Sequence, residues 1–103
     1  MAQEKHIAQG VMQIAAAQAS GVCSFRRARN EIPNHVKLSA ANLAPSQTRP
    51  GEPMWHQIVR NIKSHDSASG NFIADGRLVH VPRVGYEITK LGRSYLKSKG
   101  LHP

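Results

Sequence analysis

The sequence predicts a small α+β domain, mostly helical, in which a bundle of helices is followed by a two-stranded β-hairpin and a closing C-terminal helix. Two observations lead to this prediction. Apolar residues recur at helical spacing from Trp55 to Ile62, and they alternate with polar residues between Arg77 and Ile88. Because 103 residues are one domain's worth, we expect a single domain over residues 1–103.

The first predicted helix runs from about Gln3 to Ala19 and ends at Ser20-Gly21. Its buried stripe is formed by residues at helical spacing: Ile7, Val11, Ile14 and Ala15. The small residues at 15–17 permit close packing on a neighbour. This packing fits the core of one chain, and a homodimer contact remains the alternative.

A second, shorter helix is predicted from Phe25 to about Glu31, with Ser24 as its N-cap and Pro33 as its stop. Three cations fan around it: Arg26, Arg27 and Arg29. At least two of them must be exposed on so short a helix. They form either a solvated basic face or a set of phosphate contacts.

A short extended piece is predicted at 36–38, and Ser39 is a suitable N-cap for a helix from Ala40 to Ala44. Pro45 ends this helix. Residues 46–51 are rich in turn formers and predict a loop.

The segment from Glu52 to His65 has the clearest helical pattern, and Pro53 suits its first turn. Four apolar residues form one stripe: Trp55, Ile58, Val59 and Ile62. The opposite face carries six polar residues: His56, Gln57, Arg60, Asn61, Lys63 and Ser64. No acid occurs from 54 to 65, as a helix that lies against phosphates and base edges requires.

The C-terminal part predicts a short turn of helix at 71–75, then strands at Arg77–Val81 and Gly85–Ile88. Thr89 caps a last helix that runs from Lys90 to about Lys99 and ends at Gly100. Eight residues are predicted to organise the core: Trp55, Ile58, Val59, Ile62, Ile88, Leu91, Tyr95 and Leu96.

A bundle of helices followed by a two-stranded wing is the winged helix-turn-helix arrangement, in which the last bundle helix enters the major groove of DNA. Residues 53–65 would then be the recognition helix and residues 77–88 the wing. We expect Gln57 and Arg60 to read bases, with His56 near the deep end of the helix. As an alternative, this face only tracks phosphates.

Phosphate contacts are expected from the remaining polar residues of the recognition helix, from the wing and from the second helix. In the recognition helix these residues are Asn61, Lys63 and Ser64. The wing supplies Arg77 and Arg83, with no acid between 82 and 84, and the second helix supplies Arg26 and Arg27.

Residues 55–63 resemble the recognition helix of winged helix-turn-helix domains, and residues 85–96 resemble the strand and closing helix that follow the wing. The stretch from Pro53 to Leu96 is similar to the N-terminal DNA-binding domain of Mrr-type restriction proteins and to related winged-helix regulators. The segment Asp66–Asp75 is longer than the usual link, and the nuclease domain of a restriction protein is absent. The resemblance therefore implies the fold and DNA binding, but not cleavage.

The charge balance favours a polyanionic partner. Fourteen Lys and Arg face six Asp and Glu, which gives a formal net charge of +8. Both halves of the chain carry the excess, so it is not gathered in a tail. Membrane surfaces are also polyanionic, but the longest apolar run, 14–17, is far shorter than the roughly 20 residues of a spanning helix.

The residues that could support catalysis or bind metal are scattered. The six histidines occur singly without zinc-motif spacing, and the acids form no pair for acid–base chemistry. We therefore expect no enzyme activity, no metal and no cofactor. One cysteine, Cys23, and the lack of a basic leader with an apolar segment predict a cytoplasmic protein without a secretory signal.

Three functions remain open. The first is a winged-helix protein that binds duplex DNA, as a small transcriptional regulator or as an accessory of a defence or mobile-element system. The second is a protein–protein interaction module on the same scaffold. The third is an RNA-binding winged helix, which the 5% aromatic content disfavours because readers of single strands expose aromatic side chains for stacking.

Overall fold

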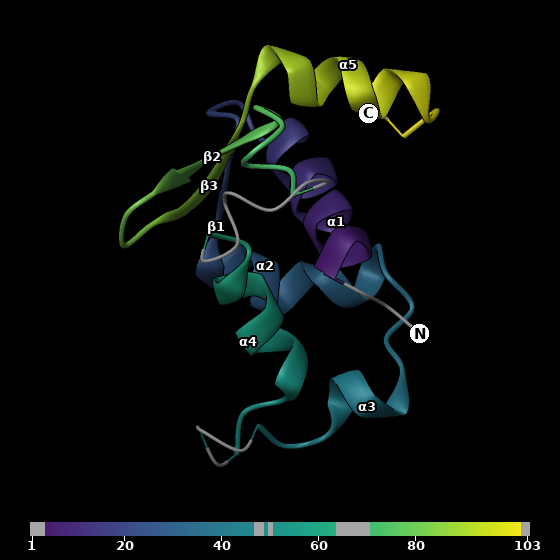
Figure 1. Cartoon of the computed structure of the whole chain (residues 1–103), viewed down its shortest axis with the longest axis vertical. Coiled ribbons are helices and arrows are strands. Elements are labelled where there is room, and N and C mark those ends of the chain that lie inside the picture. The colour runs from purple at the N-terminus through teal and green to yellow at the C-terminus, as the bar shows by residue number, and fades with distance from the viewer. Residues whose placement is uncertain (1–3, 47–48, 50, 64–70, 102–103) are drawn as a thin grey trace.

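The computed structural model describes residues 4–46, 49, 51–63 and 71–101, and these residues form an α+β fold of helices around a small antiparallel sheet (Figure 1). In chain order the elements are α1 (Glu4–Ala16), β1 (Val22–Ser24), α2 (Phe25–Glu31), the 3₁₀ helix η1 (Ile32–Asn34), α3 (Ala40–Leu43), α4 (Met54–Asn61), β2 (Leu78–Val81), β3 (Gly85–Ile88) and α5 (Lys90–Ser98). The predicted α+β class and the β2–β3 hairpin are confirmed.

The sheet has one strand that was not predicted. β1 pairs antiparallel with β3, so that Val22 lies opposite Glu87 and Ser24 opposite Gly85, and the strand order is β1-β3-β2. A strand of three residues is too short to show alternation in the sequence. Because α2 follows β1 directly, this pairing holds the start of α2 against the hairpin.

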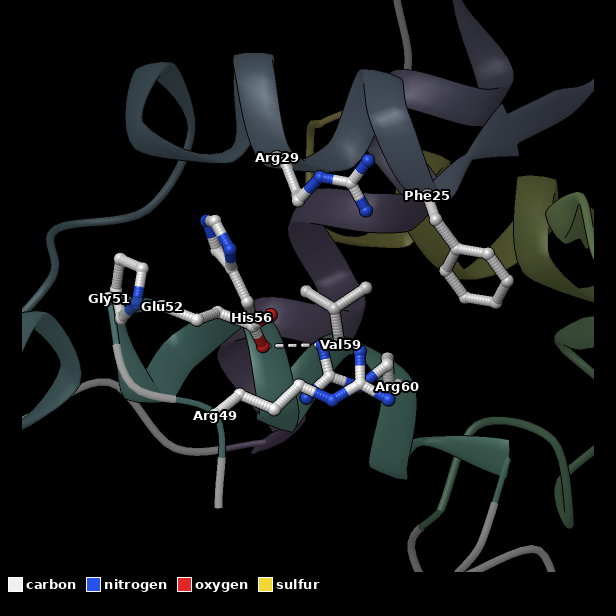
Figure 2. Close-up of a pocket in the computed structure, with 9 residues that line it drawn as sticks. Phe25, Arg29, Arg49, Gly51, Glu52, His56, Val59 and Arg60 are labelled. Atoms are coloured by element: carbon white, nitrogen blue, oxygen red, sulfur yellow. Dashed lines mark hydrogen bonds and ion pairs between the residues drawn. The ribbon is translucent and has the colours of Figure 1, made fainter. Parts of the chain in front are cut away.

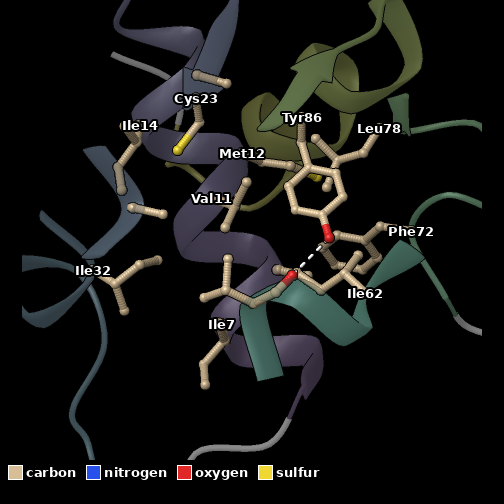
Figure 3. Close-up of a cluster of buried hydrophobic side chains, with 14 of the residues drawn as sticks. Ile7, Val11, Met12, Ile14, Cys23, Ile32, Ile62, Phe72, Leu78 and Tyr86 are labelled. Carbon is tan, nitrogen blue, oxygen red and sulfur yellow. Dashed lines mark hydrogen bonds between the residues drawn. The ribbon is translucent and has the colours of Figure 1, made fainter. Parts of the chain in front are cut away.

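Helix α1 lies at the centre of the core, where it packs on the sheet, α4 and α5 (Figure 3). Its predicted stripe is confirmed, since Ile7, Val11 and Ile14 are buried. The helix ends at Ala16, earlier than the predicted Ala19, because the chain enters a turn in which the Gly21 amide donates to the Gln18 carbonyl.

Tyr86 ties the hairpin to α4. The side chain is buried, and its hydroxyl donates to the Val59 carbonyl at 2.6 Å (Figure 3). The Lys63 amide donates to the same hydroxyl at 3.3 Å. Burial raises the pKa of Tyr86 to about 12, so the phenol stays protonated and keeps its donor. The position of α4 relative to the sheet therefore depends on this residue.

One of the eight residues predicted to lie in the core does not lie there. Leu91 is 61% exposed. The buried face of α5 is centred on Gly92 and Leu96, and Leu91 lies about 100° and about 140° away from them around the helix. Five predictions are confirmed as buried, namely Trp55, Val59, Ile62, Ile88 and Leu96, while Ile58 and Tyr95 are partly buried against the core.

Three predicted N-caps form as expected. The Ser24 hydroxyl accepts from the Arg27 amide, Ser39 forms a capping box with Asn42, and the Thr89 hydroxyl accepts from the Gly92 amide. Local side-chain chemistry therefore sets where these helices begin.

Helix α2 spans Phe25–Glu31 as predicted, and Pro33 lies in the first turn of η1, which follows it directly. Two other predictions are corrected. Residues 36–38 form no strand. Helix α4 ends at Asn61 with Ile62 as its C-cap, short of the predicted His65, which lies outside the described residues.

Candidate nucleic-acid interface

Helix α4 presents the polar face that the sequence predicted. Its other face, with Trp55 and Val59, is buried, and Ile62 just after the helix is buried as well. On the opposite side lie four partly exposed residues: His56, Gln57, Arg60 and Asn61. The predicted contact Ser64 lies outside the described residues.

A groove of about 370 Å³ lies between α2 and α4 (Figure 2). Its lining residues come from α2, α4 and the loop before α4: Phe25, Arg29, Arg49, Gly51, Glu52, Pro53, His56, Val59 and Arg60. Three of the nine are arginines and one is a carboxylate. Since the helices do not close over it, the groove is open to a ligand from solvent.

Arg60, predicted to read bases, forms an ion pair with Glu52 on the α4 side of this groove (Figure 2). The two side chains are only 26% and 21% exposed, so water screens the pair incompletely. Sequence reasoning did not foresee the pair, because eight residues separate the partners and Glu52 lies outside α4. In the free protein, Arg60 is therefore occupied by an internal anion.

Two other cations of the groove, Arg29 and Arg49, are exposed and form no ion pair with a described carboxylate. Arg29 belongs to a helix that the sequence predicted, and it shares a side of that helix with Phe25, four residues earlier. Arg49 lies in a loop, where no periodic pattern gives its direction. Arg49 was missing from the predicted site, and Arg29 was named only as one of three arginines that form either a solvated face or phosphate contacts.

The surroundings of His56 favour the neutral form of its imidazole. Burial lowers the pKa of His56 most, and nearby Arg29 and Arg60 lower it further, while Glu52 opposes them. His56 can therefore act as a neutral donor or acceptor in the groove, and the permanent positive charge of the groove comes from its arginines.

Phe25 joins the groove to the hairpin. Its ring centroid lies 5.5 Å from that of Tyr86 and 6.4 Å from that of His80, and the Lys63 ammonium lies 5.6 Å from the ring. The Phe25 amide also donates to the Val84 carbonyl at 2.8 Å. Helix α2, the end of α4 and the hairpin thus meet at one side chain and form a continuous surface.

The two predicted wing arginines lie in different surroundings. Arg83 is exposed in the turn between β2 and β3, as expected for a contact to a partner. Arg77 lies at the base of β2, where its guanidinium is 4.3 Å from the Tyr95 ring centroid and 3.3 Å from an Asp75 carboxylate oxygen. Arg77 therefore packs on the protein.

Of the remaining predicted residues, some are exposed to solvent and others contact groups of the protein itself. Arg26 is exposed on α2 but does not line the groove, and Arg27 forms an ion pair with Glu31 at 2.7 Å. Gln57 accepts a hydrogen bond from the Ser46 hydroxyl at 3.0 Å. Asn61 is partly exposed and Lys63 is exposed. The groove thus gathers His56 and Arg60 of the predicted set, and Lys63 lies beside it through Phe25.

Comparison of the chain with protein-family models, curated proteins and solved structures finds no match. Within the described part of the chain, no three His, Cys, Asp or Glu side chains lie together as a metal site would need. None of the helices described has the length and apolar character to cross a membrane. The function is therefore inferred from the geometry and charge of the α2–α4 surface.

The free energy of unfolding is expected to decrease as the pH falls from about 7.5 to about 5.5. The pKa values of His56 and His80 both lie below the ordinary 6.5, chiefly through burial, and Lys63 adds to the effect at His80. The buried Nε2 atom of His80 also has no hydrogen-bond partner among the described residues. Below pH 6.5 the unfolded chain therefore binds more protons than the folded one, which destabilises the fold.

Urea unfolding at the two pH values measures this loss. The double variant His56→Gln/His80→Gln should lose much less stability over the same pH interval. His35→Gln, at an exposed position, serves as the matched control and should decline like the parent. An equal decline in the double variant and the control would contradict this explanation.

Proposed function

We propose that this chain binds duplex DNA as a winged helix-turn-helix protein, with α4 as the recognition helix and the β2–β3 hairpin as the wing. The observation that carries the proposal is the continuous surface from α2 over α4 to the hairpin. Its cations, Arg29, Arg49, Arg60, Lys63 and Arg83, outnumber its carboxylates. Such a surface attracts a polyanion. The electrostatic attraction between its cations and the phosphates, which weakens as salt is added, supplies most of the free energy of nonspecific binding.

The order of the elements supports this assignment. Among the described elements, α1, β1 and three further α-helices precede the hairpin, and β1 pairs with the second strand of the hairpin. The connection between α2 and α4, residues 32–53, is longer than the three- to four-residue turn of a simple helix-turn-helix. It holds α3, which packs against α4, and the Ala44 carbonyl accepts from the Met54 amide at the start of α4.

The side chains of α4 match the edges of bases in the major groove. Arginine suits guanine, and glutamine or asparagine suits adenine, because each pair forms two hydrogen bonds. Gln57 and Asn61 supply such groups from one face of the helix, whereas Arg60 lines the α2–α4 groove with Glu52 and would contact a phosphate. Arg29, Arg49, Lys63 and Arg83 would contact phosphates on either side. A small transcriptional regulator, or an accessory of a defence or mobile-element system, would use such a surface.

Competition binding tests the proposal. A labelled random duplex is titrated with the protein, and unlabelled duplex DNA, single-stranded DNA and RNA of equal length compete for it. Duplex DNA should compete best. Stronger competition by RNA would make this an RNA-binding domain, and no binding of any nucleic acid at about 50 mM salt would favour a protein-interaction module.

A further inference from the structure

The α2–α4 groove contains more positive charge than its own side chains neutralise. Arg29 comes from α2, Arg49 from the preceding loop and Arg60 from α4, and the single carboxylate among the lining residues is Glu52. Glu52 pairs with Arg60, while Arg29 and Arg49 form no ion pair with a described carboxylate. Three cations that converge on one partly enclosed space repel one another unless an anion joins them.

Local backbone bonds hold Glu52 and Arg49 in place. The Glu52 amide donates to the Arg49 carbonyl at 3.1 Å, and the Ser46 amide donates to the Glu52 carbonyl at 2.7 Å. The loop thus brings the acid and a cation to the mouth of the groove together (Figure 2). Glu52 is therefore positioned on Arg60 by the fold, and the pair is not a chance contact of two long surface side chains.

We propose that the groove is a phosphate site that fills by exchange, in which a phosphate group displaces Glu52 from Arg60 and is held by Arg29, Arg49 and Arg60. Guanidinium groups bind phosphate through paired N–H donors, and a phosphate outcompetes a carboxylate where several arginines converge. Glu52 occupies Arg60 in the free protein and lowers its affinity for weak or badly placed anions.

The phosphate can belong to the backbone of a duplex or to a terminal phosphomonoester. In either nucleic-acid form the inference rests on the proposed function, but the site itself can be tested with inorganic phosphate alone. In the first experiment, phosphate is titrated at constant ionic strength and the amide chemical shifts of Arg29, Arg49 and Glu52 are followed.

Removal of the internal competitor should tighten phosphate binding. We expect Glu52→Gln to lower the phosphate dissociation constant about threefold to tenfold, and Arg29→Ala/Arg49→Ala to abolish saturable shifts. Glu31→Gln is the matched control, because it makes the same charge change beside Arg27, outside the groove. The inference fails if Glu52→Gln binds phosphate no more tightly than Glu31→Gln, or if the groove amides do not shift in the parent.

The second experiment identifies the source of the phosphate. Duplexes with and without a 5′-phosphate are compared by fluorescence anisotropy. Equal affinity for both assigns the site to a backbone phosphate, and tighter binding of the phosphorylated end assigns it to a terminal one. In Arg60→Ala, the gain from Glu52→Gln should be smaller than in the parent, since the acid then has no arginine to release and only its repulsion of the phosphate is removed. An equal gain in Arg60→Ala and in the parent overturns the exchange.

The two proposals fail in different ways. If inorganic phosphate binds the groove but no duplex binds at low salt, the phosphate site stands and DNA binding is wrong. If the duplex binds but the amide chemical shifts of the groove residues do not change with inorganic phosphate, DNA binding stands and the exchange mechanism is wrong.

Discussion

Gly85→Ala is expected to destabilise the fold by about 4 kcal/mol or more, which is a large share of the roughly 5–15 kcal/mol that holds a small domain together. A Cβ atom at Gly85 would lie 2.0 Å from the Cys23 carbonyl oxygen and 2.8 Å from the Ser24 Cα. Both neighbours are backbone atoms of β1, so no side chain can move aside. The strand β1 would have to leave β3, and the start of α2 would move with it.

Urea unfolding of Gly85→Ala and of a control variant, Gly100→Ala, measures this effect. Gly100 has a positive φ of 70°, but a Cβ atom added there would meet no described atom within 4 Å, so its substitution should cost only about 1–2 kcal/mol of backbone strain. If both variants lose the same stability, the close approach of β1 to β3 is not the reason that glycine is required at position 85.

The triple variant Arg29→Ala/Arg49→Ala/Arg60→Ala is expected to bind duplex DNA about 10³-fold more weakly at about 100 mM salt, because each lost arginine removes a charge-assisted hydrogen bond worth at least about 1.5 kcal/mol. All three side chains line the α2–α4 groove. None of them lies in the buried core, so the variant should stay folded. Fluorescence anisotropy with a random duplex gives the affinity.

A control with the same change of charge separates the groove from bulk electrostatics. Lys5→Ala/Lys90→Ala/Lys97→Ala removes three exposed cations from α1 and α5, away from the groove. Its affinity should fall by less than about tenfold, as expected when only long-range attraction is reduced. Equal losses in the two triple variants would mean that the net charge of the chain, and not the groove, drives binding.

Helix starts and the hairpin could be predicted from the sequence because short-range chemistry determines them. Ser24, Ser39 and Thr89 each cap a helix by accepting a hydrogen bond from the amide three residues later. The exposed face of α4 followed from its apolar stripe. These features depend on residues that are neighbours in the chain.

The site could be predicted only in part, because its key contacts join distant segments. The Arg60–Glu52 pair depends on how the loop at 46–52 returns to α4, and the role of Arg29 depends on the packing of α2 against α4. The packing of Arg77 on Tyr95 likewise needs α5 beside the hairpin. The periodicity of apolar residues does not predict such tertiary contacts. For the same reason Leu91, which is exposed, was wrongly assigned to the core.

The salt dependence of binding to a random duplex tests DNA binding by the α2–α4–hairpin surface most directly. Five cations on this surface, Arg29, Arg49, Arg60, Lys63 and Arg83, would each displace about one counterion. The logarithm of the binding constant should therefore fall against the logarithm of salt concentration with a slope of about −4 to −5. A slope near zero, or no binding at about 50 mM salt, would contradict the assignment of this surface to nucleic acid.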